Sequence, residues 1–195
     1  MEKTAVQKLA GALKVLVSIT FVCNLLVLPL LAGLARLRSL EELTAGISYF
    51  GAEGEKGGII ILRLAAYFLA SWQEIWLLEE TYALVLTAFL LFCGVCTAVV
   101  LWQARRVLDT VLEGLPFQEK NSKSLRLAAV CSFLISVAAL VRLIWGLAYY
   151  RTIEPLLSYN ALFIPVFFMA GLLCLVMSAL FRQAAELKAE NDLTI

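Results

Sequence analysis

The chain has 195 residues, of which 62% are hydrophobic and 16% are charged, and its formal net charge is +1. Soluble domains have roughly 45–50% apolar and 25% charged residues, so this composition excludes an ordinary water-soluble globule. The small net charge provides neither a basic field for nucleic acid nor an acidic one for calcium. Histidine, the commonest general base and zinc ligand, does not occur. We therefore expect no direct nucleic-acid binding and no metal or other cofactor.

Four long apolar segments predict an all-α integral membrane protein built as a four-helix bundle. Each segment has 20 to 23 residues, enough to cross a hydrocarbon core of about 30 Å at about 1.5 Å per residue. The four segments are residues 15–34, 82–102, 127–149 and 159–181. The first segment is not expected to be a cleaved signal peptide, because no small-residue cleavage site follows it cleanly. The prediction is a single membrane domain over residues 1–195, with an outer loop 35–81, a cytoplasmic loop 103–126 and a cytoplasmic tail 182–195.

The positions of Lys and Arg predict that both termini are cytoplasmic, because basic residues near span ends are retained on that side. Ten basic residues lie in the amino terminus, the loop 103–126 and the tail: Lys3, Lys8, Lys14, Arg105, Arg106, Lys120, Lys123, Arg126, Arg182 and Lys188. Five lie on the opposite side, in segments that also hold eight glutamates: Arg36, Arg38, Lys56, Arg63 and Arg151.

Residues 59–78 compete for a fifth span, because the segment begins with four aliphatic residues. Arg63 and Glu74 lie within it, and a central charge costs a few kcal/mol in insertion assays. A fifth crossing would also place the arginine pair of the loop 103–126 outside. We instead expect an outer-surface or re-entrant element, in which aromatic rings such as Trp72 favour the headgroup layer. This element could be helical or could begin as a strand.

The cytoplasmic loop contains a helix stop and a new helix start. The second helix is predicted to continue past Trp102, because a one-sided apolar spacing persists as far as Leu112. Gly114 then ends the helix, and Pro116 prevents it from resuming. The polar stretch 118–121 can open the third helix.

Arg142 lies four positions beyond the centre of the third segment, where a cation needs water, a partner or a route to the surface. Its side chain could extend to the outer headgroups. It could instead form a buried polar cluster with Asn24 and one of four glutamates: Glu74, Glu79, Glu80 or Glu154. Asn24 and Arg142 are therefore the candidate intramembrane polar site.

Catalytic and metal-binding groups are sparse in the predicted spans, so we expect no enzyme. Asp109 and Asp192 are the only aspartates and lie outside the spans, which excludes an intramembrane aspartate pair. The five cysteines all lie within spans, where small apolar packing is expected: Cys23, Cys93, Cys96, Cys131 and Cys174. Small residues recur every four positions and predict close helix packing: Ala128, Ser132 and Ser136, and Ala170, Cys174 and Ser178.

Two short stretches resemble a bacterial membrane-protein family known as domain of unknown function 2975. They are GLPFQEKN at residues 114–121 and the ending LKAENDLTI at residues 187–195. The four-span layout also matches, although Ala184 and Ala185 replace a glycine expected shortly before the second stretch. The resemblance implies a multi-pass protein of the bacterial cytoplasmic membrane, often encoded beside a small helix-turn-helix regulator. It implies no biochemical activity.

We expect a non-enzymatic signalling or regulatory protein that binds such a regulator through its cytoplasmic loop and tail. The candidate partner-binding residues are Pro116, Phe117, Asn121, Asn191, Asp192, Leu193, Thr194 and Ile195. The last four offer two anions and two apolar anchors to a docking groove, or the whole set could merely cap helices and fix the loop against the tail. The alternative function is transport, or immunity against a peptide or toxic small molecule, with Asn24 and Arg142 at the working site. The lipid bilayer and further copies of the chain are the other expected partners.

Overall fold

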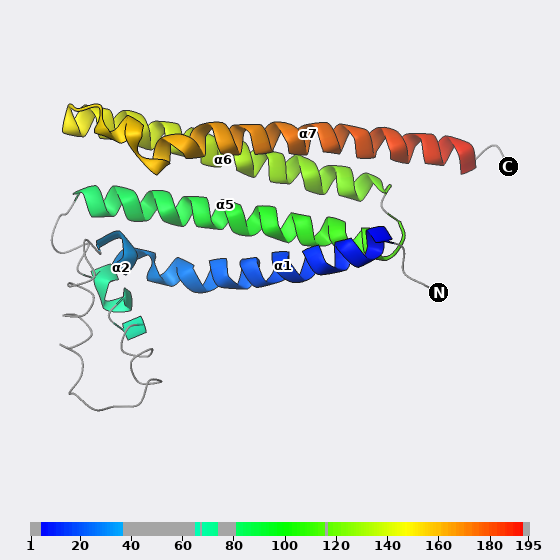
Figure 1. Ribbon diagram of the computed structural model, residues 1–195, viewed down its shortest axis with the longest axis horizontal. Coiled ribbons are helices and arrows are strands. Elements are labelled where there is room, and N and C mark those ends of the chain that lie inside the picture. The colour runs from blue at the N-terminus through cyan, green and yellow to red at the C-terminus, as the bar shows by residue number, and fades with distance from the viewer. Residues whose placement is uncertain (1–4, 37–64, 67, 74–80, 116, 193–195) are drawn as a thin grey trace. The chain divides into compact units, whose positions relative to one another are not determined.

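A computed structural model describes residues 5–36, 65–66, 68–73, 81–115 and 117–192. Every regular element in these ranges is a helix (Figure 1). Four helical stretches among them are long and apolar enough to cross a membrane: Val6–Gly33, Thr81–Leu112, Glu119–Tyr150 and Tyr159–Asn191. The all-α class and the four predicted spans are thus confirmed within the described residues, and they make the chain a multi-pass membrane protein. The side on which the termini lie stays a prediction.

The chain forms two compact units, one over Leu25–Phe92 and one that joins Met1–Asn24 to Cys93–Ile195. Helix α1 (Ala5–Val27) and helix α5 (Thr81–Leu112) each begin in one unit and end in the other. Helices α6 (Glu119–Tyr150) and α7 (Tyr159–Asp192) lie wholly in the larger unit.

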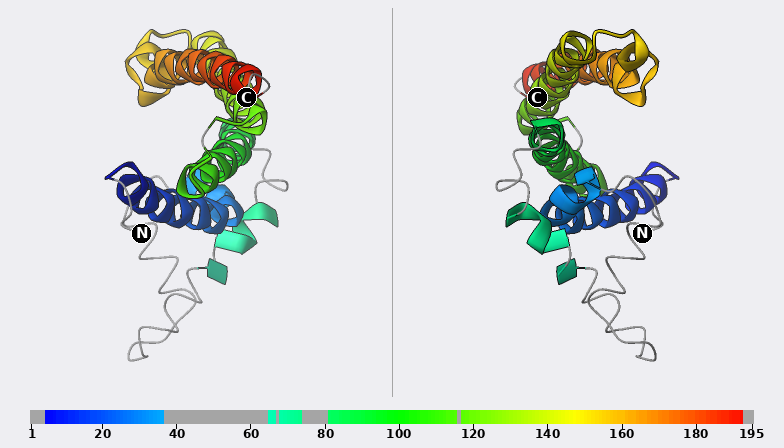
Figure 2. Two further views of the ribbon diagram at one scale, coloured as in Figure 1. Left: turned by 90° about the vertical axis from the view of Figure 1, so that its right-hand side faces the viewer. Right: turned by 90° about the vertical axis from the view of Figure 1, so that its left-hand side faces the viewer.

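Helices α6 and α7 pack against each other as an antiparallel pair (Figure 1), and the two end-on views of Figure 2 show them adjacent as well. The contact face of α6 is made of small residues, since Ala128, Ser132 and Ser136 are all buried. On α7, a Cβ atom placed on Gly171 would lie 2.8 Å from Cε1 of Phe133. Only a glycine allows this approach of the Phe133 ring, and the burial of Ala128, Ser132 and Ser136 agrees with the close packing predicted for them.

A tight connection joins the two helices at the far end from the tail. Arg151 ends α6 in the left-handed region, with φ 52°, and its N–H donates to the carbonyl oxygen of Leu147 at 3.0 Å. A 3₁₀ turn, η2 (Glu154–Leu157), then leads into α7. Pro155 of this turn packs near Gly146, where an added Cβ would lie 3.5 Å from the ring.

In the smaller unit, Pro29 interrupts the first apolar helix. A 3₁₀ turn, η1 (Leu28–Leu30), follows α1, and the short helix α2 (Leu31–Arg36) continues from it. The indole N–H of Trp72 donates to the carbonyl oxygen of Pro29 at 2.7 Å. The Phe68 ring lies against Gly33, where a Cβ atom would overlap it. Residues 65–66 and 68–73 are helical, and the rest of the element predicted at residues 59–78 lies outside the described residues.

Candidate functional site

The turn between α5 and α6 is built around Gly114, as the sequence predicted. Gly114 has φ 77°, a conformation that side chains other than glycine rarely adopt. The N–H groups of Gly114 and Leu115 donate to the carbonyl oxygens of Val111 and Thr110 and close the last turn of α5. Helix α6 then begins at Glu119 after the extended residue Gln118. The predicted helix stop and helix start are therefore both confirmed.

The buried side chain of Asn121 connects the two helices on either side of this turn. Its side chain is only 1% exposed, and its Nδ2 donates to the Thr110 hydroxyl at 2.6 Å. That hydroxyl in turn donates to the carbonyl oxygen of Val107 at 2.7 Å. Because a buried polar side chain needs partners to offset its lost hydration, this chain of bonds fixes the end of α5 to the start of α6. Asn121 therefore points into the protein rather than toward a docking partner.

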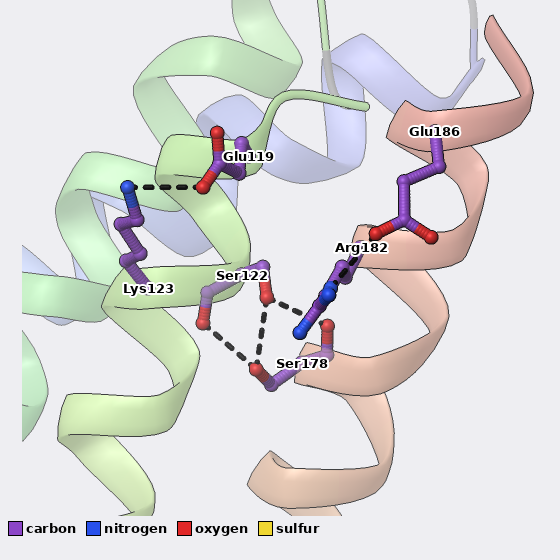
Figure 3. Close-up of polar contacts among 6 residues, drawn as sticks. All are labelled: Glu119, Ser122, Lys123, Ser178, Arg182 and Glu186. Atoms are coloured by element: carbon purple, nitrogen blue, oxygen red, sulfur yellow. Dashed lines mark hydrogen bonds and ion pairs between the residues drawn. The ribbon is translucent and has the colours of Figure 1, made fainter. Parts of the chain in front are cut away.

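A pair of serines joins α6 to α7 at the same end of the molecule. The Ser122 hydroxyl donates to the carbonyl oxygen of Ser178 at 2.9 Å, and the Ser178 hydroxyl donates to that of Ser122 at 2.8 Å. Both residues are buried. Figure 3 shows them facing each other, with Arg182 and Glu186 on the following turns of α7. The loop and the tail therefore lie at the same end of the α6–α7 pair, which we name the loop–tail end (residues 113–115, 117–123 and 182–192).

The described residues of the loop–tail end line two grooves. The first, which we name the tail groove, has a volume of about 690 Å³ and is lined by Phe117, Leu187, Lys188, Glu190 and Asn191. Phe117 and Leu187 are 51% and 66% exposed, although both lie outside the apolar segments. The Phe117 ring also contacts that of Phe181, with centroids 5.9 Å apart, so one side of it is held in place. The tail groove is a fixed apolar surface with charged residues beside it.

The second groove, which we name the arginine groove, has a volume of about 740 Å³ and lies between the start of α6 and the end of α7. Its charged lining residues are Glu119, Lys123, Arg126, Arg182 and Glu186. Lys123 pairs with Glu119 at 3.0 Å, and Arg182 pairs with Glu186 at 2.8 Å. Arg126 is exposed and forms no ion pair within the described part of the chain.

The ion pairs of the arginine groove set its electrostatics. The hydrogen bond from Lys123, together with the charge of that ammonium group, lowers the pKa of the Glu119 carboxyl, and Arg182 adds a smaller effect in the same direction. The hydrogen bond to Glu186, with its negative charge, raises the pKa of the Arg182 guanidinium. Both pairs are solvent-exposed, so each contributes little to stability and can open to admit another anion.

Some of the predicted partner-binding residues lie together at the loop–tail end, and others lie outside the residues that the structure describes. Phe117 and Asn191 line the same groove, as a docking surface requires. Asp192 is the last residue of α7. Pro116 and residues 193–195 lie outside the described residues.

The structure gives Arg142 a partner that the sequence reasoning did not consider. Its Nη1 donates to Oδ1 of Asn160 at 3.2 Å, and Nδ2 of Asn160 donates to the carbonyl oxygen of Ala139 at 3.3 Å. Oδ1 of Asn24 is buried with no hydrogen-bond partner among the described residues. Of the four candidate glutamates, Glu74, Glu79 and Glu80 lie outside the described residues.

Sequence reasoning also missed the roles of Ser122, Thr110 and Asn160. Ser178, the partner of Ser122, did belong to a pattern visible in the sequence, the small-residue repeat of the fourth span. A single serine or threonine next to a span carries no pattern of its own, so its partner becomes visible only when the helices are paired.

No curated protein and no solved structure matches the chain significantly. One family model does match it, from residue 12 to residue 195. The match covers most of the first apolar helix, the other three, the α5–α6 turn and the tail, which agrees with the resemblance carried by the loop and the ending. The chain belongs to the family described as "Protein of unknown function (DUF2975)".

Proposed function

We propose that this chain is a non-enzymatic regulatory protein of the bacterial cytoplasmic membrane that holds a small helix-turn-helix protein at its cytoplasmic loop–tail end. The tail groove is the proposed docking site. A regulator held there is kept from DNA, and a stimulus at the outer loop would release it.

The observation that carries this proposal is the exposure of Phe117 and Leu187 in one groove beyond the apolar segments. Water-exposed large apolar side chains that gather in a groove rimmed by polar groups are typical of protein interaction sites. Leu187 lies six residues past residue 181 on α7, or about 9 Å at about 1.5 Å per residue, which places it beyond the apolar segment. The family resemblance supports the identity of the partner, because its members are often encoded beside such regulators.

Capture of the neighbouring gene's regulator by the purified full-length chain tests the proposal. Phe117→Ser should reduce capture about tenfold or more, because a buried aromatic anchor dominates many interfaces. Tyr159→Ser is the matched control, since Tyr159 is 85% exposed but lies at the opposite end of α7. Deleting residues 190–195 should also reduce capture. Equal capture by the Phe117→Ser and Tyr159→Ser variants, or no capture by the wild type, contradicts the proposal.

The second candidate function is transport, or immunity against a peptide or toxic small molecule. Its support is the bond between Arg142 and Asn160, because charged groups within spans are often functional. If Arg142→Gln abolishes a resistance or transport phenotype while regulator capture is absent from the wild type, this second function is favoured.

A further inference from the structure

We propose that the arginine groove binds the negatively charged headgroup of a phospholipid from the leaflet that borders the loop–tail end. This site goes beyond the proposed function, since the regulator occupies the tail groove.

The first support is the position of the two arginines at the ends of two apolar segments. Arg126 is the last residue before the apolar segment 127–149, and Arg182 is the first residue after the segment 159–181. Because α6 and α7 are antiparallel and Ser122 faces Ser178, Arg126 lies about one turn to the membrane side of this pair and Arg182 about one turn to the side away from the membrane. Their backbone positions are therefore offset by about 12 Å along the helices. Both arginines line the arginine groove, so the groove extends across the membrane boundary, where the phosphates of a bilayer lie.

The second support is the charge balance of the groove. Three cations line it against two carboxylates. Lys123 and Arg182 engage the two carboxylates, which leaves Arg126 without an ion pair among the described residues. A bound phosphate would supply the missing anion, and a guanidinium group can hold it through two parallel hydrogen bonds.

The third support is the apolar surface that continues from the groove into the bilayer. Leu127, Val130 and Leu134 follow Arg126 at helical spacing, and each is 44–46% exposed. They offer a path for an acyl chain directly beside the cation. A free phosphate would use Arg126 but not this path, so a lipid fits the surroundings better than a soluble anion does.

Lipid retention by the full-length chain in neutral detergent, counted by native mass spectrometry, tests the proposal. Phosphatidylglycerol carries a net negative headgroup, whereas phosphatidylethanolamine has the same phosphate and acyl chains without net charge. We expect the wild type to retain phosphatidylglycerol in preference. Arg126→Gln should lower that retention about fivefold, as expected for the loss of one cation near an anionic lipid surface.

Two controls separate this site from general charge effects. Lys120→Gln removes an exposed cation of α6 that does not line the groove, and it should change retention by less than about twofold, because a cation outside the site contributes little. Excess inorganic phosphate should leave the lipid bound, because it lacks acyl chains.

Three results would overturn the proposal. They are equal retention of the two lipids by the wild type, equal losses in the Arg126→Gln and Lys120→Gln variants, and displacement of the lipid by inorganic phosphate. The comparison of the two lipids uses the wild type alone, so it tests the proposal even if a substitution impairs folding. Regulator capture is measured in a separate experiment, so a failure of the lipid proposal can be told apart from a failure of the proposed function.

Discussion

Ser122 and Ser178, 56 positions apart in the chain, each donate a hydrogen bond to the other's backbone carbonyl oxygen across the α6–α7 contact. Their hydroxyl oxygens are 3.1 Å apart, so neither bond can lengthen without disturbing the other. The pair thus fixes the register of the two helices next to both grooves.

Removing these hydroxyls should loosen the α6–α7 pair. Ser122→Ala and Ser178→Ala should each reduce stability by about 0.5–1.5 kcal/mol, the usual range for an intramolecular hydrogen bond. The double variant should lose less than the sum, because loss of either bond already weakens the other. Thermal unfolding in detergent, followed by tryptophan fluorescence, measures all three. Strict additivity would show that the two bonds act independently.

Asn121→Ala should lower stability by about 1–3 kcal/mol, because it removes a buried hydrogen bond and leaves space at the Thr110 hydroxyl. Lys120→Ala is the matched control, since the neighbouring Lys120 is exposed. The same unfolding measurement compares them. If both variants unfold at the same temperature, Asn121 does not fasten the turn.

The amphipathic and apolar spacing predicted the four spans, the extension of α5 beyond Trp102 and the stop at Gly114, because those features depend on local sequence. The same spacing could not identify Asn160 as the partner of Arg142, because that contact depends on the register of α6 against α7. The register is set by close packing at positions such as Gly171. Asn121 was predicted to bind a partner because it belongs to the loop stretch that carries the family resemblance, and only the fold of the turn shows that it is buried.

The carboxyl group of Glu119 should make a small contribution to the acid sensitivity of the loop–tail end, because its ion pair with Lys123 is exposed. Its folded-state pKa lies below the ordinary value of 4.5, so its stabilising effect is complete above pH about 4.5 and is lost as the pH falls through the lower value. Glu119→Gln should therefore reduce the loss of stability between neutral and acidic pH. Glu113→Gln, at an exposed position in the same turn region, should not. An NMR titration of Lys123→Met should show a higher pKa for Glu119.

In the smaller unit, the contact between Gly33 and Phe68 can be tested by substitution. Gly33→Ala should lower stability by about 1–3 kcal/mol, because a Cβ at this position would lie 2.9 Å from the Cα atom of Phe68 and force the backbone to shift. Gly11→Ala is the matched control, since a Cβ there would lie 3.9 Å from Cδ2 of Leu112, an ordinary contact. Equal unfolding temperatures for the two variants would contradict this packing.

Labelling can establish the predicted topology. In a variant without the five native cysteines, Gln118→Cys and Glu190→Cys should react with an impermeant maleimide only in inverted membrane vesicles. Leu157→Cys, at a position that is 87% exposed, should react only in intact spheroplasts. Labelling of Gln118→Cys and Glu190→Cys from opposite faces would rule out the arrangement with both at the cytoplasmic side.

The bend between α5 and α6 depends on Gly114 and Asn121, whereas the wall of the tail groove is made by Phe117 and by residues of α7. Shape and surface chemistry at this end of the molecule are thus supplied by different side chains. Relatives could exchange Phe117 or the α7 residues, and so acquire new binding preferences, without rebuilding the scaffold that presents them.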